Sequence, residues 1–283
     1  MAIKILKGNS KGKKLKSSAA ESISGLSLPT EKSVRSDSLQ DYSILLYGDK
    51  KIGKTSLTSQ FEDTLAMMCE PGGKAQEMFQ VSCKNWKELR GYTKLFINDP
   101  RFKTASIDTA DYAYEFCMDY VCQKMVIDHP SDEGYGKGWK AVRAEFTSWL
   151  NELLHSGKGV IFISHSRDNE FKTRKGDSFN KVSASMSGQA KEILEGLVDI
   201  WGNYTYDGKK RYLIIGGSDE VDAGNRVEGH FLDVDGQPLD RIPMGNTPKE
   251  AYRNFKAAFE NKLQAVREKA VEQPRTKLII RKK

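Results

Sequence analysis

The chain has 283 residues, a formal net charge of +7, and 38% hydrophobic and 29% charged residues. This length suits one large α/β domain or two small ones. No apolar run approaches the roughly 20 residues that cross a bilayer, and the lysine-bearing N-terminus lacks the apolar core of a secretion signal. We therefore expect a cytoplasmic protein with no membrane partner.

Basic residues are concentrated at both ends of the chain. Six lysines precede the first acidic residue, Glu21, and residues 1–40 are rich in Lys, Ser and Gly but poor in large apolar side chains. Such a segment cannot bury enough surface to order itself, so we expect a flexible basic arm. The folded domain is expected over residues 41–247, followed by a C-terminal helix and basic tail over residues 248–283.

Four cysteines occupy positions 69, 83, 117 and 122. No pair has the C-x-x-C spacing that is typical of a zinc site. We therefore expect reduced cysteines packed in the core of an intracellular protein.

The clearest chemical signal is the phosphate-binding pattern G-x-x-x-x-G-K-[ST], which residues 48–55 match as GDKKIGKT. An apolar run over residues 43–47 predicts a buried strand before this loop, and residues 56–61 favour a helix after it. In that order, backbone N–H groups and a helix N-terminus turn toward bound phosphates. The alternative is a chance match in a basic surface loop. The residues expected to contact the nucleotide are Gly48, Asp49, Lys50, Lys51, Ile52, Gly53, Lys54, Thr55 and Ser56.

Two residues of this pattern have distinct roles. Lys54 would reach the β- and γ-phosphates, and the hydroxyl of Thr55 would ligate Mg²⁺. No guanine-reading N-K-x-D sequence is present. We therefore expect ATP and Mg²⁺ as cofactors.

The rest of the chain alternates apolar strands with amphipathic helices. Strands are expected at residues 65–69, 104–107 and 159–164, and helices at 85–97, 112–127, 139–154, 187–197 and 248–271. Asp207-Gly208 indicates a hairpin between residues 200–206 and 211–215. Residues 130–138 favour turns, and 217–247 show no clear element. The pattern predicts an α/β fold with a mostly parallel sheet, helices on both faces and a late antiparallel hairpin.

Three polar residues are expected where strands end, the edge at which such sheets bind ligands. Asp108 follows the strand at 104–107 and would hold Mg²⁺ through water, as in the Walker B position. The alternative is that Asp108 caps the next helix, although Asp111 is better placed as that cap.

The other two, Glu70 and His165, are candidates for catalysis. Glu70 ends the second strand, which we expect beside the first, and would orient or deprotonate the attacking water. His165 ends the strand at 159–164 and would sense the γ-phosphate by hydrogen bonding. The alternatives are a solvated loop glutamate and an ordinary histidine at a strand end.

Residues 166–183 are polar, charged and without periodicity. Phe171 and Phe179 lie among basic residues that would track a phosphate backbone while the rings stack on bases. A solvated hairpin or loop is the alternative. The candidate DNA-binding residues are Arg167, Lys172, Arg174, Lys175 and Lys181.

A cation from a neighbouring subunit often completes the site of an ATPase of this type. The candidates are Lys209, Lys210, Arg211 and Arg226, and for each a solvated basic face is the alternative. Arg226 is preferred because it lies in a loop after the hairpin.

Together, the loop at 48–55, Glu70, Ser-Ile-Asp-Thr at 106–109 and Phe-Ile-Ser-His at 162–165 resemble the RecA-like core of P-loop NTPases. The runs at 107–117, 135–139 and 159–166 are similar to bacteriophage AAA-type ATP-binding proteins. Some of these are related to RecA and the Rad recombinases and act in phage recombination or single-strand annealing.

This resemblance extends over about residues 41–230. It implies an ATPase that binds ATP and Mg²⁺ through Lys54, Thr55 and Asp108. It also implies a catalytic Glu70, a sensor at His165 and contact with single-stranded DNA through the loop after that strand. As partners we expect single-stranded DNA, further copies of the chain, and a phage or host replication or recombination protein.

Other functions remain open at this stage. One is an ATPase motor or loader that acts on a protein partner in helicase loading or DNA packaging. Another is a DNA-binding module that nucleotide switches with little turnover. A nucleoside or nucleotide kinase is a weaker alternative, because no acceptor-site signature accompanies the loop at 130–138.

Overall fold

The computed structural model describes residues 28–172 and 178–263 of the chain, which divides into two units, residues 1–35 and 36–283. Within the first unit, residues 28–35 form no helix or strand. Most of the predicted N-terminal arm and the basic tail after residue 263 lie outside the described residues. Every element named below belongs to the second unit.

The centre of this unit is a parallel sheet made of β1 (Ser43–Gly48), β2 (Thr64–Met68), β3 (Phe79–Ser82), β4 (Thr104–Asp108), β5 (Gly159–Lys172) and β7 (Ile200–Asp207). These strands lie in the order β7-β1-β5-β4-β2-β3. Every residue of β1, β2 and β4 is buried, because the sheet is covered on both faces. The antiparallel strands β8 (Lys210–Ile214) and β10 (Arg241–Pro243) extend the sheet beyond β7.

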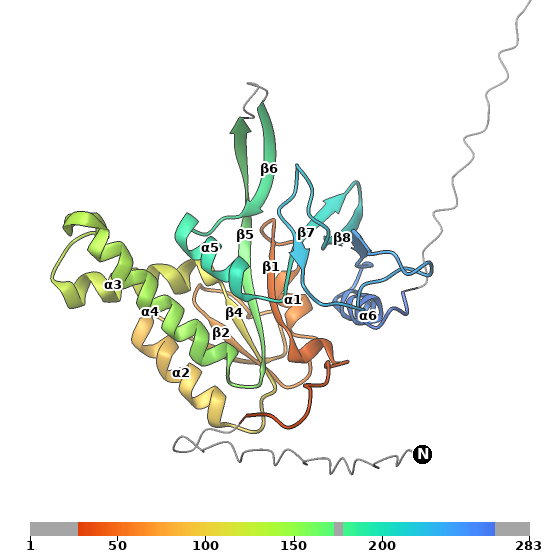
Figure 1. Ribbon diagram of the computed structural model, residues 1–283, viewed down its shortest axis with the longest axis horizontal. Helices are drawn as coiled ribbons and strands as arrows, with labels where there is room; N and C mark the ends of the chain where they lie inside the picture. Colours follow the sequence, from red (N-terminus) through yellow and green to blue (C-terminus); the bar gives the residue numbers. More distant parts are fainter. Residues whose placement is uncertain (1–27, 173–177, 264–283) are drawn as a thin grey trace, which may run out of the picture. The chain divides into compact units, whose positions relative to one another are not determined.

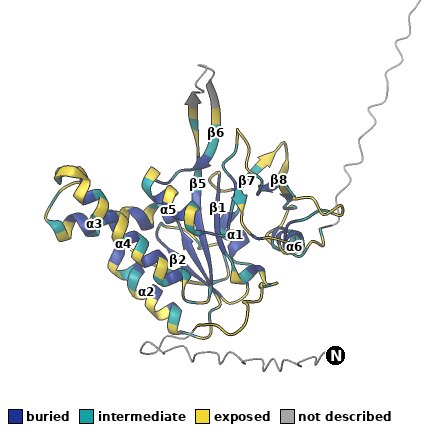
Figure 2. Ribbon diagram, in the orientation of Figure 1, coloured by how far each residue is buried: buried dark blue, intermediate teal, exposed yellow. Residues whose placement is uncertain are grey.

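Helices cover the two faces of the sheet (Figure 1). They are α1 (Lys54–Thr58), α2 (Trp86–Asn98), α3 (Ala110–Met125), α4 (Lys137–Leu154), α5 (Gly188–Leu197) and α6 (Pro248–Phe259), with short 3₁₀ turns at Leu39–Asp41, Pro130–Asp132 and Gly134–Gly136. Side chains of β1 alternate between the faces: Leu45 and Tyr47 pack with α2–α5, whereas Ile44 and Leu46 pack with α1 and α6. The helices are accordingly buried on the side that faces the sheet and exposed on the other (Figure 2). The predicted α/β class and the mostly parallel sheet are confirmed.

The hairpin predicted around Asp207-Gly208 is confirmed as β7 and β8, which pair antiparallel. Four strands were missed, namely β3, β9 (Gly224–Asn225), β10 and β6 (Ser178–Ala184), the last of which is described below. β3 is mostly exposed, and both β9 and β10 are too short to show an alternating pattern. The C-terminal helix was predicted to reach residue 271, but α6 ends at Phe259, followed by Asn261 in the left-handed conformation that commonly terminates a helix.

The prediction that the strand from Gly159 ends at His165 is wrong. Pairing with β1 does stop there, at Gly48 opposite His165, but β5 runs on to Lys172 and pairs antiparallel with β6 (Ser178–Ala184). In Figure 1 this hairpin, hereafter the β5–β6 hairpin, projects beyond the sheet. A two-stranded projection has no second layer to bury one face, so its sequence lacks the apolar alternation that marks a strand.

Candidate nucleotide-binding site

The loop at residues 48–55 is fixed in shape by its glycines. A Cβ atom on Gly48 would lie 2.1 Å from the carbonyl oxygen of Tyr204, so only glycine fits between the neighbouring strands. Lys51 and Gly53 have φ angles of 66° and 110°, which turn the loop back on itself before α1. A helix was predicted at residues 56–61, but the structure has the short helix α1 at Lys54–Thr58. Its macrodipole is weaker than that of a longer helix, so the backbone amides of the loop would contribute more of the attraction for phosphate.

Lys54 is folded back onto the loop that precedes it. Its side chain is buried, and Nζ donates to the carbonyl oxygens of Gly48 at 2.7 Å and Asp49 at 2.8 Å. Burial lowers the pKa of the Lys54 ammonium to about 8, although the nearby carboxylates of Asp108 and Asp49 act in the opposite direction. The cation is therefore held at the mouth of the loop with little solvation, where a phosphate would compete well for it.

Asp108 lies at the carboxyl end of β4 and contacts Thr55. The Thr55 hydroxyl donates to Oδ2 of Asp108 at 2.6 Å, and Asp108 as a residue is only 3% exposed. Burial raises the pKa of Asp108 above its usual value, and the hydrogen bond from Thr55 partly offsets that shift. This pair brings together the two groups predicted to bind Mg²⁺.

The predicted cap of the following helix was wrong. The N-cap of α3 is Thr109, joined to Asp108 by a cis peptide bond, and Asp111 lies inside the first turn. The carboxylate of Asp111 instead accepts a hydrogen bond from Ser185 at 2.5 Å. Because the Asp108 side chain contacts Thr55 and does not occupy the cap, the capping alternative for Asp108 is also removed.

Glu70 reaches the site by a route that differs from the expected one. β2 pairs with β4 and β3, so it does not lie beside β1 as predicted. Glu70 is still close to the loop because β2 and β4 end at the same edge, where its backbone N–H lies 3.3 Å from the Asp108 carbonyl oxygen. Its Oε1 lies 3.5 Å from Nε2 of His165, which comes from β5. Nδ1 of His165 is buried and has no hydrogen-bond partner among the described residues.

One pocket of about 280 Å³ collects these side chains. Lys54, Glu70, Asp108 and His165, the four predicted catalytic residues, all line it. The remaining lining residues are Lys51, Gly53, Thr55, Ser56, Gly73, Ala75 and Gln76. The segment at 73–76 was missed because a short polar turn after a strand has no chemical signature in the sequence.

Four predicted contact residues of the loop, Gly48, Asp49, Lys50 and Ile52, do not line the pocket, and Gly48 instead lies against Tyr204. Ile52 is buried in the core with α6 and anchors the loop, and Lys50 is exposed. The carboxylate of Asp49 accepts a hydrogen bond from the Ser166 hydroxyl at 2.6 Å, a contact that the sequence did not reveal.

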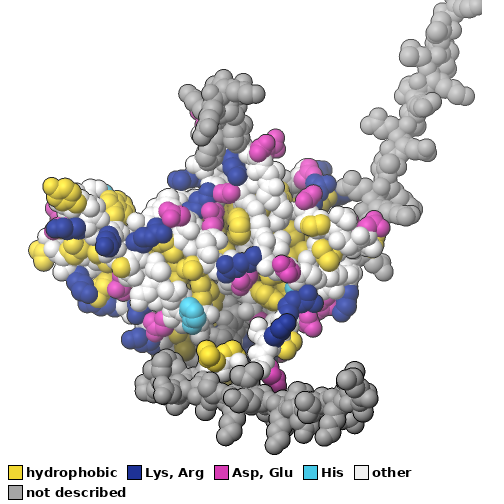
Figure 3. Space-filling model, viewed as in Figure 1, with side chains coloured by type: hydrophobic (Ala, Val, Ile, Leu, Met, Phe, Trp, Pro, Cys, Tyr) yellow, Lys and Arg dark blue, Asp and Glu magenta, His cyan; other side chains and the backbone are white. Residues whose placement is uncertain are grey.

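The predicted DNA-binding residues are only partly described. Arg167 is on β5, and Lys181 on β6 forms an ion pair with Asp222 at 3.2 Å. Lys172 ends β5, but its side chain lies outside the described residues, as do Arg174 and Lys175 entirely. On the face shown in Figure 3, basic and acidic side chains of the described residues are interspersed.

Arg226 is engaged within its own chain. Nε donates to Asp199 at 2.9 Å, and the two terminal nitrogens donate to the carbonyl oxygens of Gly196 and Leu197. Its role across a subunit boundary stays a prediction.

The chemistry of the pocket fits a magnesium-bound nucleotide. Among residues 28–172 and 178–263, no group of three or more His, Cys, Asp or Glu side chains is arranged to hold a metal ion alone. Mg²⁺ is commonly held by one or two protein groups together with substrate phosphates and water, which matches the Thr55–Asp108 pair. Lys54 would supply a polar partner to the phosphates.

Residues 40–227 match the family model described as an AAA domain. The chain belongs to the AAA domain family. It is therefore a P-loop protein of the nucleotide-binding ATPase type.

A curated relative comes from a prophage. It is the "SPbeta prophage-derived uncharacterized protein YorG" of Bacillus subtilis (strain 168), which is 25% identical over 145 residues. The aligned part covers 49% of this chain and 45% of that protein, so this chain spans less than half of the relative's length. The predicted link to phage proteins is supported at this level. Within the described residues, no helix is long and apolar enough to cross a membrane.

The lowered pKa of Lys54 predicts proton uptake on nucleotide binding. Above pH 8 the free protein has a largely neutral Lys54, and a bound phosphate raises its pKa again, so binding must take up a proton and weaken as the pH rises. Well below pH 8 the lysine is already charged and adds no uptake. Calorimetric titration with Mg-ATP at pH 8.5, in two buffers with different ionisation enthalpies, measures this directly. Identical binding enthalpies in the two buffers would contradict the assignment.

Proposed function

We propose that this protein hydrolyses ATP in a Mg²⁺-dependent reaction at the pocket beside Lys54. The observation that carries the proposal is the convergence of Lys54, the Thr55–Asp108 pair, Glu70 and His165 on one pocket of about 280 Å³. A nucleotide-binding loop alone would require only the first two. A carboxylate and an imidazole in the same pocket add groups that can act on a water molecule.

Each side chain has a distinct task in this proposal. When bound, Mg-ATP supplies the electrophilic phosphoryl group and neutralises part of its charge. Lys54 exchanges its bonds to the Gly48 and Asp49 carbonyls for bonds to phosphate. Glu70 accepts a proton from water, and His165 donates a hydrogen bond toward the phosphate end of the pocket.

We further propose that the ATPase acts with single-stranded DNA in recombination or strand annealing. The support is the course of β5, which passes through the pocket at His165 and continues into the β5–β6 hairpin, where the candidate DNA-binding residues Arg167 and Lys181 lie. DNA bound to the hairpin would therefore contact β5, the same β-strand that carries the pocket residue His165. The proposal includes assembly with other copies of the chain and a phage or host replication or recombination partner.

The test is steady-state ATP hydrolysis with and without single-stranded DNA. We expect DNA to stimulate hydrolysis, and joint neutralisation of Lys172, Arg174 and Lys175 to weaken DNA binding and flatten its salt dependence, because fewer phosphate contacts release fewer counterions. If the salt dependence of DNA affinity is the same in this variant and in the native protein, the hairpin does not contact the DNA backbone.

The alternatives give different results in the same assay. An ATPase that acts on a protein partner would hydrolyse ATP at a rate that DNA does not change. A nucleotide-switched binding module would bind DNA and nucleotide with negligible turnover. The hairpin favours the DNA-linked ATPase over both, because β5 runs from the pocket into a projection that carries candidate DNA-binding residues.

A further inference from the structure

Both strands of the β5–β6 hairpin are hydrogen-bonded to residues at the start of the phosphate-binding loop, Tyr47 and Asp49. We propose that the hairpin positions this loop through two fastening points, one at Ser166 and one at Asp222. Ser166 and Asp222 are positioning residues in this view. The effect on turnover rests on the proposed ATPase function, whereas the physical link between hairpin and loop does not.

The first fastening point is on β5. Ser166 directly follows the pocket residue His165, and its hydroxyl donates to the carboxylate of Asp49 at 2.6 Å. Asp49 is the second residue of the loop, and its carbonyl oxygen accepts from Nζ of Lys54 at 2.8 Å. A shift of β5 is therefore transmitted to the catalytic lysine through a single intervening residue.

The second fastening point is on β6 and uses Tyr47, the last residue before the loop. Its side chain is fully buried, and the hydroxyl donates to the carbonyl oxygen of Asp222 at 2.5 Å, with that of Val182 at 3.2 Å. Val182 belongs to β6. Its N–H donates to Glu220 O at 2.8 Å, and Asp222 N–H donates back to Val182 O at 3.0 Å. One hydroxyl thus contacts both β6 and the segment at 220–222, at the start of the loop.

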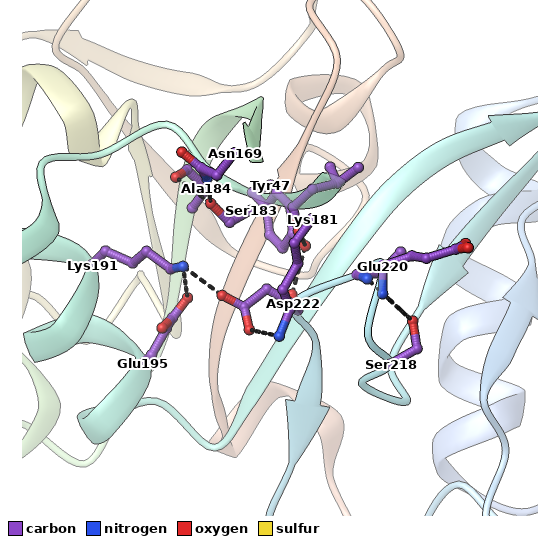
Figure 4. Close-up of polar contacts among 12 residues, drawn as sticks. Tyr47, Asn169, Lys181, Ser183, Ala184, Lys191, Glu195, Ser218, Glu220 and Asp222 are labelled. Atoms are coloured by element: carbon purple, nitrogen blue, oxygen red, sulfur yellow. Dashed lines mark hydrogen bonds and ion pairs between the residues drawn. The ribbon is translucent and has the colours of Figure 1, made fainter. Parts of the chain in front are cut away.

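Charge holds this second point in place (Figure 4). The carboxylate of Asp222 pairs with Lys191 of α5 at 2.5 Å and with Lys181 of β6 at 3.2 Å. Burial alone would raise the pKa of Asp222, but the two lysines hold it below its usual value. Glu195 lies 3.8 Å from Lys191, yet burial raises its pKa to about 7, so it competes weakly for the lysines near neutral pH. Asp222 is the anion that ties β6 to α5.

These contacts make the hairpin and the loop respond to one another. A polyanion on β6 would compete with Asp222 for Lys181 and loosen the segment that Tyr47 contacts. By linkage, if a ligand on the hairpin changes the affinity of the loop for nucleotide, then nucleotide changes the affinity of the hairpin for that ligand by the same factor. The ligand that we expect to bind at Lys181 and act on the loop is therefore a chain of phosphates, such as the backbone of single-stranded DNA.

Hydrogen exchange of the nucleotide-free protein tests the link. The double variant Tyr47→Phe/Ser166→Ala removes both hydroxyls with little change in shape, and we expect the amides of residues 49–54 to exchange about tenfold faster, because two hydrogen bonds are lost. The matched control is Tyr114→Phe, which removes a hydroxyl bond of 2.7 Å from α3 to Gln189 and should leave the loop unchanged. Thermal unfolding of each variant is measured to check that the fold persists. Unchanged exchange at 49–54 in the double variant would overturn the proposal.

A second measurement separates the link from the proposed function. The dissociation constant of Mg-ATP is measured with and without single-stranded DNA in the native protein and in Asp222→Asn, and we expect the DNA effect to shrink at least severalfold in the variant. If DNA has no effect on the native protein while the exchange result holds, the DNA-linked function fails and the link stands. If DNA changes affinity equally in both proteins, Asp222 has no part in the coupling.

Discussion

Replacement of Lys54 by Ala is expected to abolish ATP hydrolysis, with a loss of at least a hundredfold, and to weaken nucleotide binding. Nζ is the only side-chain cation that the described structure places both in the mouth of the loop and in buried contact with it. A charge held in this poorly solvated position interacts strongly with developing phosphate charge, and mutation of a single such donor typically costs two or three orders of magnitude in rate. Steady-state hydrolysis and equilibrium nucleotide binding measure the two effects.

The fold should survive this replacement. Burial disfavours the Lys54 ammonium, which is why its pKa falls to about 8, so removing the charge relieves a desolvation penalty. Two carbonyl oxygens lose a donor in exchange, and we expect the midpoint of thermal unfolding to change by no more than a few degrees. Lys50→Ala is the matched control, since this lysine lies in the same loop but is exposed. A native rate of hydrolysis in Lys54→Ala would contradict the assignment of this pocket as the site of ATP hydrolysis.

Much of the site could be predicted because its signals are local. The loop at 48–55 is a contiguous pattern, and Asp108 and His165 each follow an apolar run, so their places at the carboxyl edge of the sheet follow from strand direction alone. The strand order was harder. Nothing local in β2 states that its neighbour is β4, because that choice depends on how the connections cross the sheet.

The contacts between distant segments could not be predicted. Tyr47 bonds to Asp222, 175 residues away, and Ser166 bonds to Asp49, 117 residues away. Each is an ordinary polar residue whose partner is defined only after the sheet has formed. The β5–β6 hairpin was missed as a pair of strands for the related reason that neither of its faces is buried by a second layer.

Replacement of Glu70 by Gln is expected to reduce hydrolysis by two to four orders of magnitude while nucleotide binding is kept. The amide has the shape of the carboxylate but cannot accept a proton from water, and general base catalysis contributes about that much to a rate. The Glu70 carboxylate is partly buried, lines the same pocket as Lys54 and lies 3.5 Å from His165, which suits a base that acts on water in this pocket. Binding would persist because Lys54 and the Thr55–Asp108 pair are untouched.

The separation of turnover from binding decides between the two interpretations of Glu70. A solvated loop glutamate would leave both quantities unchanged, as we expect for the control Glu77→Gln, which alters an exposed carboxylate on the same connection after β2. A base would lower turnover alone. If Glu70→Gln instead weakened binding and turnover equally, Glu70 would contact the nucleotide in the ground state as well as in the transition state. Asp108 would then be the remaining carboxylate of this pocket that could direct water.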